Sequence, residues 1–189
     1  DMQCGTINIA ANAFFTVESG DSVVNKGVIN NNGIIAAEGT KGLYNIECSE
    51  ITDHKDKDGN LTHTSGEINI LAADAITYVQ GNKGTINMYN RSNEVVVKSN
   101  EGKIVYNYNY TTDGATFEKK SSDRFSYVVF GTDATAITLK DAAANDLTKV
   151  SLEFKGSTTL TTNTKTIDDL VVATGANLKV NSGNTLTVS

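Results

Sequence analysis

The 189-residue sequence contains no proline and no tryptophan, and it has only two cysteines and two methionines. Long runs of Leu, Ala, Glu and Lys are also missing, whereas Ile and Val are plentiful and Asn and Thr make up about a quarter of the chain. β-branched side chains fit a pleated sheet and lose rotamer freedom in a helix, and Asn and Gly supply turns with positive φ. The composition therefore predicts an all-β protein.

Concentrated positive charge and long apolar runs are missing as well. The net charge is −6, the pI is about 4.9, and the 16 Lys and Arg residues form no dense patch. Because binding to a phosphate backbone depends on such a patch, we expect no nucleic-acid partner. No apolar run approaches the roughly 20 residues of a membrane span, so we expect no membrane insertion.

The first residues of the sequence bear on whether the chain is processed, and its few cysteines bear on the cellular compartment. The sequence begins with Asp1 in place of an initiator Met, and residues 1–12 have no basic start and no apolar centre, so we expect a processed protein or an excised piece of a longer one. Cys4 and Cys48 are either one disulfide or two thiols, and a chain of this size does not depend on them for its core. The cysteines alone do not identify the compartment.

A short phrase with the pattern Gly-x-Ile-Asn recurs through the first part of the chain. Its successive copies are spaced by 22, 15, 24, 18 and 18 residues. A constant strand with irregular steps is typical of a coiled β-structure in which the loops vary and the turns of the coil do not. The copies begin at Gly5, Gly27, Gly42, Gly66 and Gly84, with a weaker copy at Gly102.

Strand alternation assigns two faces to these copies. The second and fourth positions after each glycine are mostly apolar, which predicts that they point inward: Ile7, Ile29, Tyr44, Ile68, Ile86 and Ile104 at the second position, and Ile9, Asn31, Ile46, Ile70, Met88 and Tyr106 at the fourth. The first and third positions are predicted to point outward. The third position then forms an outer column of Asn8, Asn30, Asn45, Asn69, Asn87 and Val105.

Strands that stack in register about 20 residues apart predict a single-stranded parallel β-helix, or β-solenoid, with residues 1–189 as one elongated module. The alternative is a β-sandwich of short antiparallel strands. An Asp58-Gly59 turn signal predicts a protruding hairpin within residues 49–70. Residues 140–149 predict a single helical turn with Asp141 as its N-cap. The Gly-x-Ile-Asn pattern stops near residue 115, which is a candidate boundary.

Similar stretches stand near both ends of the chain. LVVATGANLKVNSGNTLTV (residues 170–188) repeats its Leu and Gly positions every eight residues, and FTVESGDSVV (residues 15–24) has the same spacing. With NKGVINNNGIIAAEG (residues 25–39), these stretches resemble the β-helical repeats of large secreted bacterial surface proteins and adhesins. The resemblance implies a non-enzymatic, extracellular structural or adhesive module on the bacterial cell surface. The implied partners are other copies or adjoining modules of a surface assembly, or host or surface glycans.

The enzymatic alternative is a carbohydrate-active β-helix, either a polysaccharide lyase or a hydrolase. Such a site needs clustered carboxylates with a basic residue or calcium nearby. The acidic residues here are scattered, and the neighbours Asp168 and Asp169 point to opposite faces if they lie in a strand. We therefore expect a protein that is not an enzyme, with no catalytic residues and no cofactor.

The stretch YNYNY is the best candidate ligand-binding site. Tyr106, Tyr108 and Tyr110 alternate with Asn, which places three phenol rings on one face of a strand. An exposed strip of this kind suits stacking on sugar rings or a protein hot spot. The alternative is that the rings point inward and pack in the core, which the register of Tyr106 favours.

The stretch DHKDKDGN (residues 53–60) is a candidate calcium loop through Asp56, Asp58 and Asn60. A helix–loop–helix calcium site has Asp where His54 stands and Glu where Ser65 stands. Both residues differ from that pattern, and turn chemistry alone explains Asp-Gly-Asn.

Two more expectations follow if the copies stack in chain order. Cys4 and Cys48 would lie two turns apart, about 9.6 Å along the axis, which exceeds the limit of about 7 Å between the Cα atoms of a disulfide. We therefore expect no strain-free bridge between them. Neither end of the sequence has a polar helix or a charged cap, so we expect open ends and association into a larger assembly.

Overall fold

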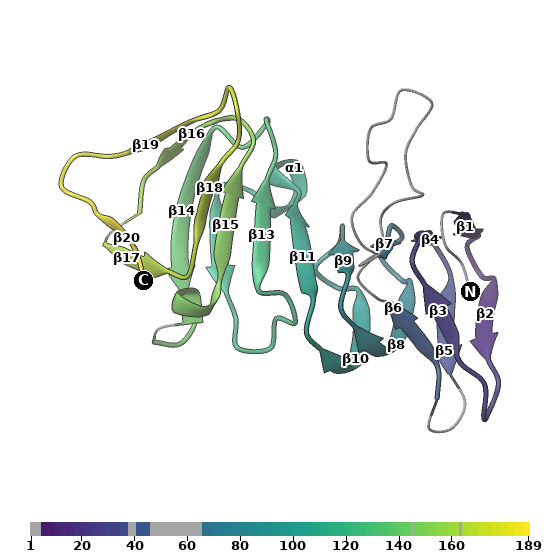
Figure 1. The fold of residues 1–189 in the computed structure, drawn as a ribbon. Helices are drawn as coiled ribbons and strands as arrows, with labels where there is room; N and C mark the ends of the chain where they lie inside the picture. The colour runs from purple at the N-terminus through teal and green to yellow at the C-terminus, as the bar shows by residue number, and fades with distance from the viewer. Residues whose placement is uncertain (1–4, 38–40, 46–65, 145, 163) are drawn as a thin grey trace. The chain divides into compact units, whose positions relative to one another are not determined.

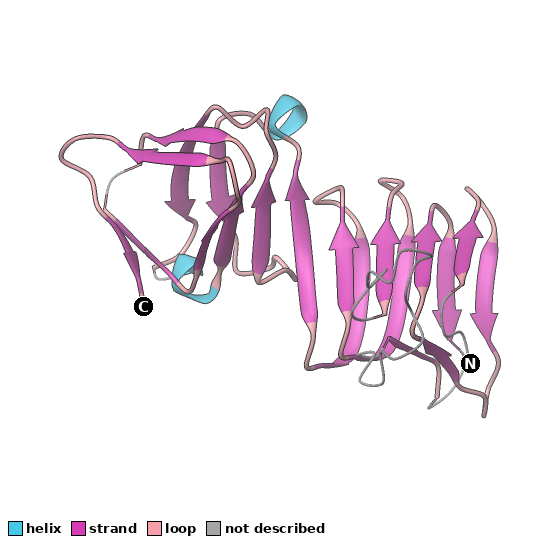
Figure 2. Cartoon of the chain, turned by 45° about the horizontal axis from the view of Figure 1, so that its top comes forward, coloured by secondary structure: helices cyan, strands magenta, loops and turns pink. Residues whose placement is uncertain are grey.

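The structure is a computed structural model that describes residues 5–37, 41–45, 66–144, 146–162 and 164–189. It is an all-β fold with 53% strand and 5% helix, in which parallel sheets stack as a β-solenoid of about 8 turns (Figures 1 and 2). The solenoid prediction is therefore confirmed. The β-sandwich alternative is wrong, because the strands pair in parallel with strands of the next turn.

The chain divides into two compact units, Asp1–Ile104 and Val105–Ser189. In each unit one turn of the solenoid, called a rung from here on, consists of two or three short strands. The strands of the first unit are β1 (Thr6–Ile9), β2 (Phe14–Val17), β3 (Val23–Asn25), β4 (Val28–Asn31), β5 (Ile34–Ala37), β6 (Leu43–Asn45), β7 (Glu67–Ile70), β8 (Ile76–Asn82), β9 (Thr85–Met88) and β10 (Glu94–Asn100). Strand β11 (Lys103–Tyr108) begins in the first unit and continues into the second.

The second unit contains two single helical turns among its strands. Its further elements are α1 (Tyr110–Asp113), β12 (Thr116–Lys119), β13 (Tyr127–Phe130), β14 (Ala136–Asp141), the 3₁₀ helix η1 (Asp146–Lys149), β15 (Ser151–Phe154), β16 (Ser157–Leu160), β17 (Lys165–Ile167), β18 (Leu170–Val172), β19 (Asn177–Val180) and β20 (Leu186–Val188).

The strands on one side of successive rungs pair with each other and form a parallel sheet. In the first unit one side is β1-β4-β7-β9 and another is β2-β5-β8. The long strand β8 serves two sides, because Ile76 in its first half pairs with β5 and Asn82 in its second half pairs with β6. In the second unit the sides are β11-β13-β15-β18, β12-β14-β16-β19 and β17-β20.

The predicted faces are correct for the copies at Gly5, Gly27, Gly66 and Gly84. In β4, β7 and β9 the second and fourth residues are buried and the first and third are half-exposed. Ile29, Ile68 and Ile86 are register partners in successive rungs and form an aliphatic column of the core.

Gly27, Gly84 and Gly102, which open three of the copies, are required because successive rungs approach closely at those points. A Cβ atom on Gly84 would lie 2.1 Å from the carbonyl oxygen of Gly66, and one on Gly102 would lie 2.2 Å from that of Gly84. Gly27 has the same relation to Gly5, at 2.3 Å. No side chain fits between these backbones, so the repeated glycine is a packing requirement of the stack.

The copy at Gly42 does not join this stack, and its predicted faces are wrong. Its strand β6 pairs with β3 and β8, while β4 pairs directly with β7. Leu43 and Asn45 are fully buried, and Tyr44 points outward. The reason is the short step, because the 15 residues from Gly27 do not complete a rung. Strand β6 is therefore the third side of the rung that β4 begins.

The outer asparagine column forms a hydrogen-bonded ladder. The amide of Asn30 donates to Asn8 at 2.8 Å, that of Asn69 to Asn30 at 3.0 Å, and that of Asn87 to Asn69 at 2.9 Å. Glu67 Oε1 also accepts from Asn87 at 3.3 Å. Asn45 does not belong to this ladder. In the weaker copy at Gly102, Val105 is buried although it was predicted to point outward.

A second asparagine ladder lies inside the first unit, and the repeat analysis did not predict it. The side-chain amide of Asn25 donates to Asn45 at 2.9 Å, that of Asn45 to Asn82 at 2.8 Å, and that of Asn82 to Asn100 at 2.7 Å. The first three are at most 1% exposed. The sequence signal was Asn-x-Gly at residues 25–27, 82–84 and 100–102, because Asn25 Oδ1 accepts the N–H of Gly27 and so closes the corner before the next strand.

The similar stretches near both ends contain the same turn. Gly20, Gly175 and Gly183 have φ angles of +93°, +82° and +82°, which side chains disfavour. Each turn is closed by a backbone hydrogen bond, from Asp21 to Glu18, from Ala176 to Ala173 and from Asn184 to Asn181. These glycines mark the corner between two sides of a rung.

Other expectations have mixed outcomes. The predicted helical turn is the 3₁₀ helix η1, and Asp141 Oδ1 accepts the N–H of Leu147 within it at 2.7 Å rather than capping a helix start. The helical turn α1 was not predicted. The predicted hairpin tip and both Cys4 and Cys48 lie outside the described residues, so the disulfide expectation stays a prediction.

Candidate functional site

The core columns of the second unit continue into its last rung, which consists of β18, β19 and β20. Tyr108, Phe130, Phe154 and Val172 are register partners in successive rungs. The rings of Phe130 and Phe154 stack with centroids 4.8 Å apart. In the same way, Leu160 pairs with Val180 and Ile167 with Val188. The residues of the last rung therefore point in the direction that defines the core in the rungs before it.

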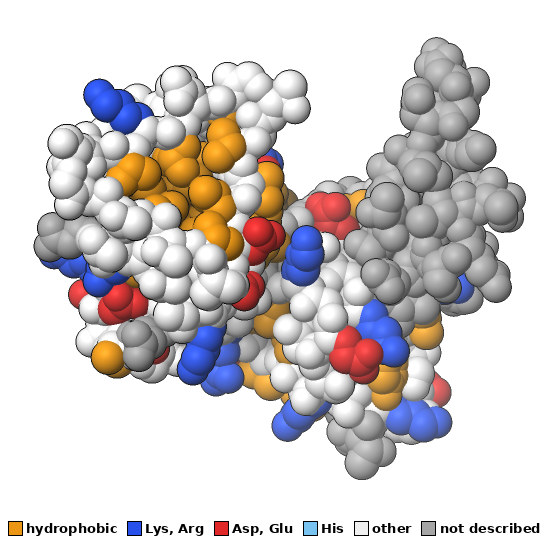
Figure 3. All heavy atoms as spheres, turned by 60° about the vertical axis from the view of Figure 1, so that its left-hand side comes forward, with side chains coloured by type: hydrophobic (Ala, Val, Ile, Leu, Met, Phe, Trp, Pro, Cys, Tyr) orange, Lys and Arg blue, Asp and Glu red, His pale blue; other side chains and the backbone are white. Residues whose placement is uncertain are grey.

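These core-facing side chains of the last rung are uncovered. Phe154 is completely buried, whereas its partner Val172 is 42% exposed and Val188 is 48% exposed. Figure 3, which turns the C-terminal part of the chain toward the viewer, shows hydrophobic side chains gathered there. We call this surface the open end. It consists of Leu170, Val172, Leu178, Val180, Leu186 and Val188. All of them except Val172 and Val188 are half-buried.

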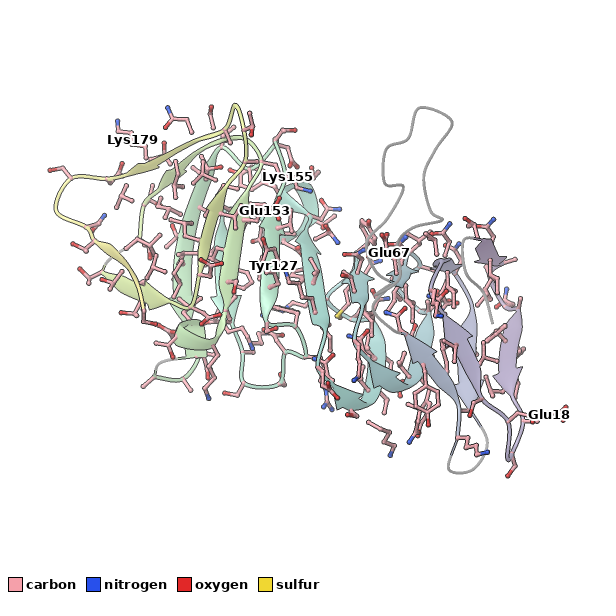
Figure 4. The ribbon with its side chains drawn as sticks, viewed as in Figure 1. Glu18, Glu67, Tyr127, Glu153, Lys155 and Lys179 are labelled. Carbon is pink, nitrogen blue, oxygen red and sulfur yellow. The ribbon has the colours of Figure 1, made fainter. Side chains whose placement is uncertain are left out.

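The open end also presents strand edges. Strands β18, β19 and β20 each pair with one strand of the preceding rung, and in the described residues no strand pairs with their other side. Lys179 is the one charged residue in these three strands, and as the partner of Thr159 it lies on the outward face (Figure 4). An edge without inward charges or proline is a template for pairing with another strand.

The predicted tyrosine strip is not an exposed surface. Tyr106 and Tyr108 are buried, at 1% and 5% exposure, and Tyr110 leaves the strand to begin α1. Tyr106 stacks on Phe125 with centroids 4.9 Å apart, and its hydroxyl donates to the carboxylate of Asp113. The inward alternative is therefore correct for two of the three rings.

The hydroxyl of Tyr108 explains why a tyrosine is tolerated in this core. It lies 3.0–3.2 Å from the carbonyl oxygens of Asp113, Gly114 and Thr116. Its single O–H can donate to any one of these carbonyls at the turn after β11, so the buried polar atom is satisfied. These rings stabilise the second unit and are not available to a surface ligand.

A polar cluster lies on the outer face of β13 and β15 (Figure 4). The hydroxyl of Tyr127 donates to Glu153 at 3.0 Å, and Lys155 lies 3.8 Å from the same carboxylate. Burial, followed by the hydrogen bond and the negative charge of Glu153, raises the pKa of Tyr127 above its ordinary value. A phenol with a raised pKa keeps its proton at neutral pH and acts as a hydrogen-bond donor.

The predicted calcium ligands Asp56, Asp58 and Asn60 lie outside the described residues, so that site stays a prediction. Among the residues that the structure does describe, there is no group of three or more His, Cys, Asp or Glu placed to hold a metal ion. Within that same part of the chain, no helix has the length and apolar character needed to cross a bilayer.

No protein-family model, no curated protein and no solved structure matches this chain. The fold is therefore established by the structure, and function has to be inferred from the surfaces that it presents.

Proposed function

We propose that this chain is a non-enzymatic structural or adhesive module of an extracellular bacterial cell-surface protein or surface assembly. It joins other copies or adjoining modules through the open end. The observation that supports this proposal is the uncovered last rung, in which six apolar core-facing side chains and three strand edges are exposed together.

The physical reason is that a solenoid rung cannot bury its own core face. The next rung in the stack covers the core face of each rung; Phe154, for example, is completely buried and has Val172 of the last rung as its register partner. A partner that adds a further β-rung removes apolar surface from water, at about 25 cal/mol per Å², and pairs the free N–H and C=O groups. A β-rung of the same kind satisfies both requirements at once.

The extracellular location rests on the repeats near both ends, which resemble those of secreted bacterial surface proteins. The composition fits the same proposal, because a surface of Asn and Thr with a net charge of −6 is hydrated without strong attraction to nucleic acid.

Two neighbouring valines allow a matched test. Val172 faces the core direction and Val171 faces outward opposite Glu153, yet their exposures are similar, at 42% and 37%. We expect the chain to associate at tens of micromolar in sedimentation velocity. Val172→Lys should shift it toward monomer, because a charge would be buried in the contact, and Val171→Lys should leave the association unchanged.

A wild-type chain that stays monomeric at these concentrations would contradict association between copies and would favour an adjoining module as the source of the next rung. Association that persists equally in both variants would contradict the open end as the contact surface.

A further inference from the structure

The lateral surface of the first unit has a notch where β8 lacks a side chain. Tyr44 on β6, Gly81 on β8 and Ser99 on β10 are register partners in successive rungs. Gly81 is therefore flanked by a phenol ring on one side and a hydroxyl on the other. A Cβ atom at Gly81 would lie 3.0 Å from Cδ1 of Tyr44, so the ring lies close over the glycine backbone.

This notch is part of a groove of about 250 Å³, which Gln80, Asn82, Lys83 and Glu101 also line. Pockets for drug-sized ligands measure about 300–1,000 Å³. The groove is smaller and open, which suits a single ring held on the surface of a longer molecule. Asn82 belongs to the inner ladder and is 1% exposed, so this part of the groove floor is held in place.

The charged groups of the groove compensate each other. Lys83 Nζ lies 3.2 Å from Glu101 Oε2, and the two side chains are 57% and 65% exposed. An exposed ion pair contributes only about 0–1 kcal/mol, so both groups can exchange partners for a ligand at little cost. The groove thus offers donors from Lys83, acceptors from Glu101 and both from Ser99, with no net charge.

We propose that this groove binds one residue of a neutral hexose oligosaccharide, with a face of the pyranose ring stacked on Tyr44. A pyranose has an apolar face of C–H groups and a rim of hydroxyls, which match the phenol ring and the surrounding donors and acceptors. An anionic ligand meets Glu101 as well as Lys83, and a purely apolar ligand leaves the polar groups unpaired. This inference uses the lateral surface and does not depend on the open end.

The test uses the full chain with cellohexaose, maltohexaose and mannohexaose as probes in isothermal titration calorimetry. We expect at least one of them to bind. Tyr44→Ala should weaken binding about tenfold or more, because it removes the stacking face. Gly81→Ala should also weaken binding, because its methyl group would displace the Tyr44 ring by a few tenths of an ångström.

Two variants separate the site from folding defects. Tyr44→Phe keeps the ring and should bind as the wild type does within about threefold, and Tyr89→Ala removes a tyrosine that is 41% exposed elsewhere in the first unit and should have no effect. The proposal is overturned if none of the three oligosaccharides binds, if Tyr44→Ala binds like the wild type, or if Tyr89→Ala loses as much affinity as Tyr44→Ala.

Discussion

Asparagine has two different roles in the first unit, and the face on which it lies decides which. Asn87 on the outer ladder is half-exposed, so water replaces a lost hydrogen bond. Asn82 on the inner ladder is buried, accepts from Asn45 and donates to Asn100. The asparagine side chain therefore contributes little to stability on the outer face and is needed for stability on the inner one.

A substitution series in neighbouring residues tests this difference. Asn82→Ala should reduce the free energy of unfolding by about 1–3 kcal/mol, because one N–H of the buried Asn45 amide loses its acceptor, while the other still reaches the carbonyl oxygen of Thr85. Ile86→Ala should reduce it by about 2–4 kcal/mol through a cavity in the core column. Asn87→Ala should cost less than about 1 kcal/mol. Urea denaturation measures all three, and equal losses at Ile86 and Asn87 would contradict the assignment of faces.

At the scale of the element, glycine is present for two separate reasons. Gly84 opens a strand copy and has the backbone of Gly66 against it. Gly175 has a positive φ angle, and in the described part of the chain no atom beyond its two neighbours lies within 4 Å of the place that a Cβ atom would occupy. The first glycine answers a packing constraint between rungs, and the second answers the conformation of a single turn.

These two constraints predict different costs for the same substitution. Gly84→Ala should destabilise by about 3 kcal/mol, because the nearest contacting atom is the backbone carbonyl oxygen of Gly66, which cannot move aside. Gly175→Ala should cost about 1–2 kcal/mol, which is the penalty for an L-residue in the left-handed region. Chemical denaturation of both variants checks the order, and a larger loss for Gly175→Ala would show that the rungs can separate at Gly84.

For the tyrosines of β11, the pattern of the strand alone did not show whether their face is exposed or buried. Alternation correctly placed Tyr106 and Tyr108 on one face, but alternation alone does not say whether that face meets water or core. Packing against Phe125 and Phe130 decided it. Tyr110 left the row because the strand ends before it and Asn109 caps α1 by accepting the N–H of Thr112.

For the whole molecule, the proposed contact through the open end would make stability depend on association. A contact that forms only between folded copies stabilises the folded state by mass action. The apparent melting temperature of the wild type should therefore rise when the protein concentration is raised about tenfold. Val172→Lys should melt at a temperature that does not change with concentration, and Val171→Lys should behave like the wild type. A concentration-independent melting temperature for the wild type would contradict contacts between copies.

The amino-acid sequence by itself determined the all-β class, the parallel solenoid and the two faces of the copies at Gly5, Gly27, Gly66 and Gly84. These features follow from local rules, because alternation sets the faces and a glycine without a Cβ atom permits the close approach of rungs.

Only the tertiary structure decided which strands stack on which. The copy at Gly42 has the same phrase as its neighbours, yet its strand became a different side of the rung, which turned Tyr44 outward and Asn45 inward. That exchange placed Asn45 in the inner ladder and Tyr44 beside Gly81, and so produced both the buried hydrogen bonds and the lateral groove. The physical reason is that the buried hydrogen bonds and the groove both depend on contacts between residues about 20 to 40 positions apart. Those residues meet because of where the chain turns from one side of a rung to the next, which the local pattern does not determine.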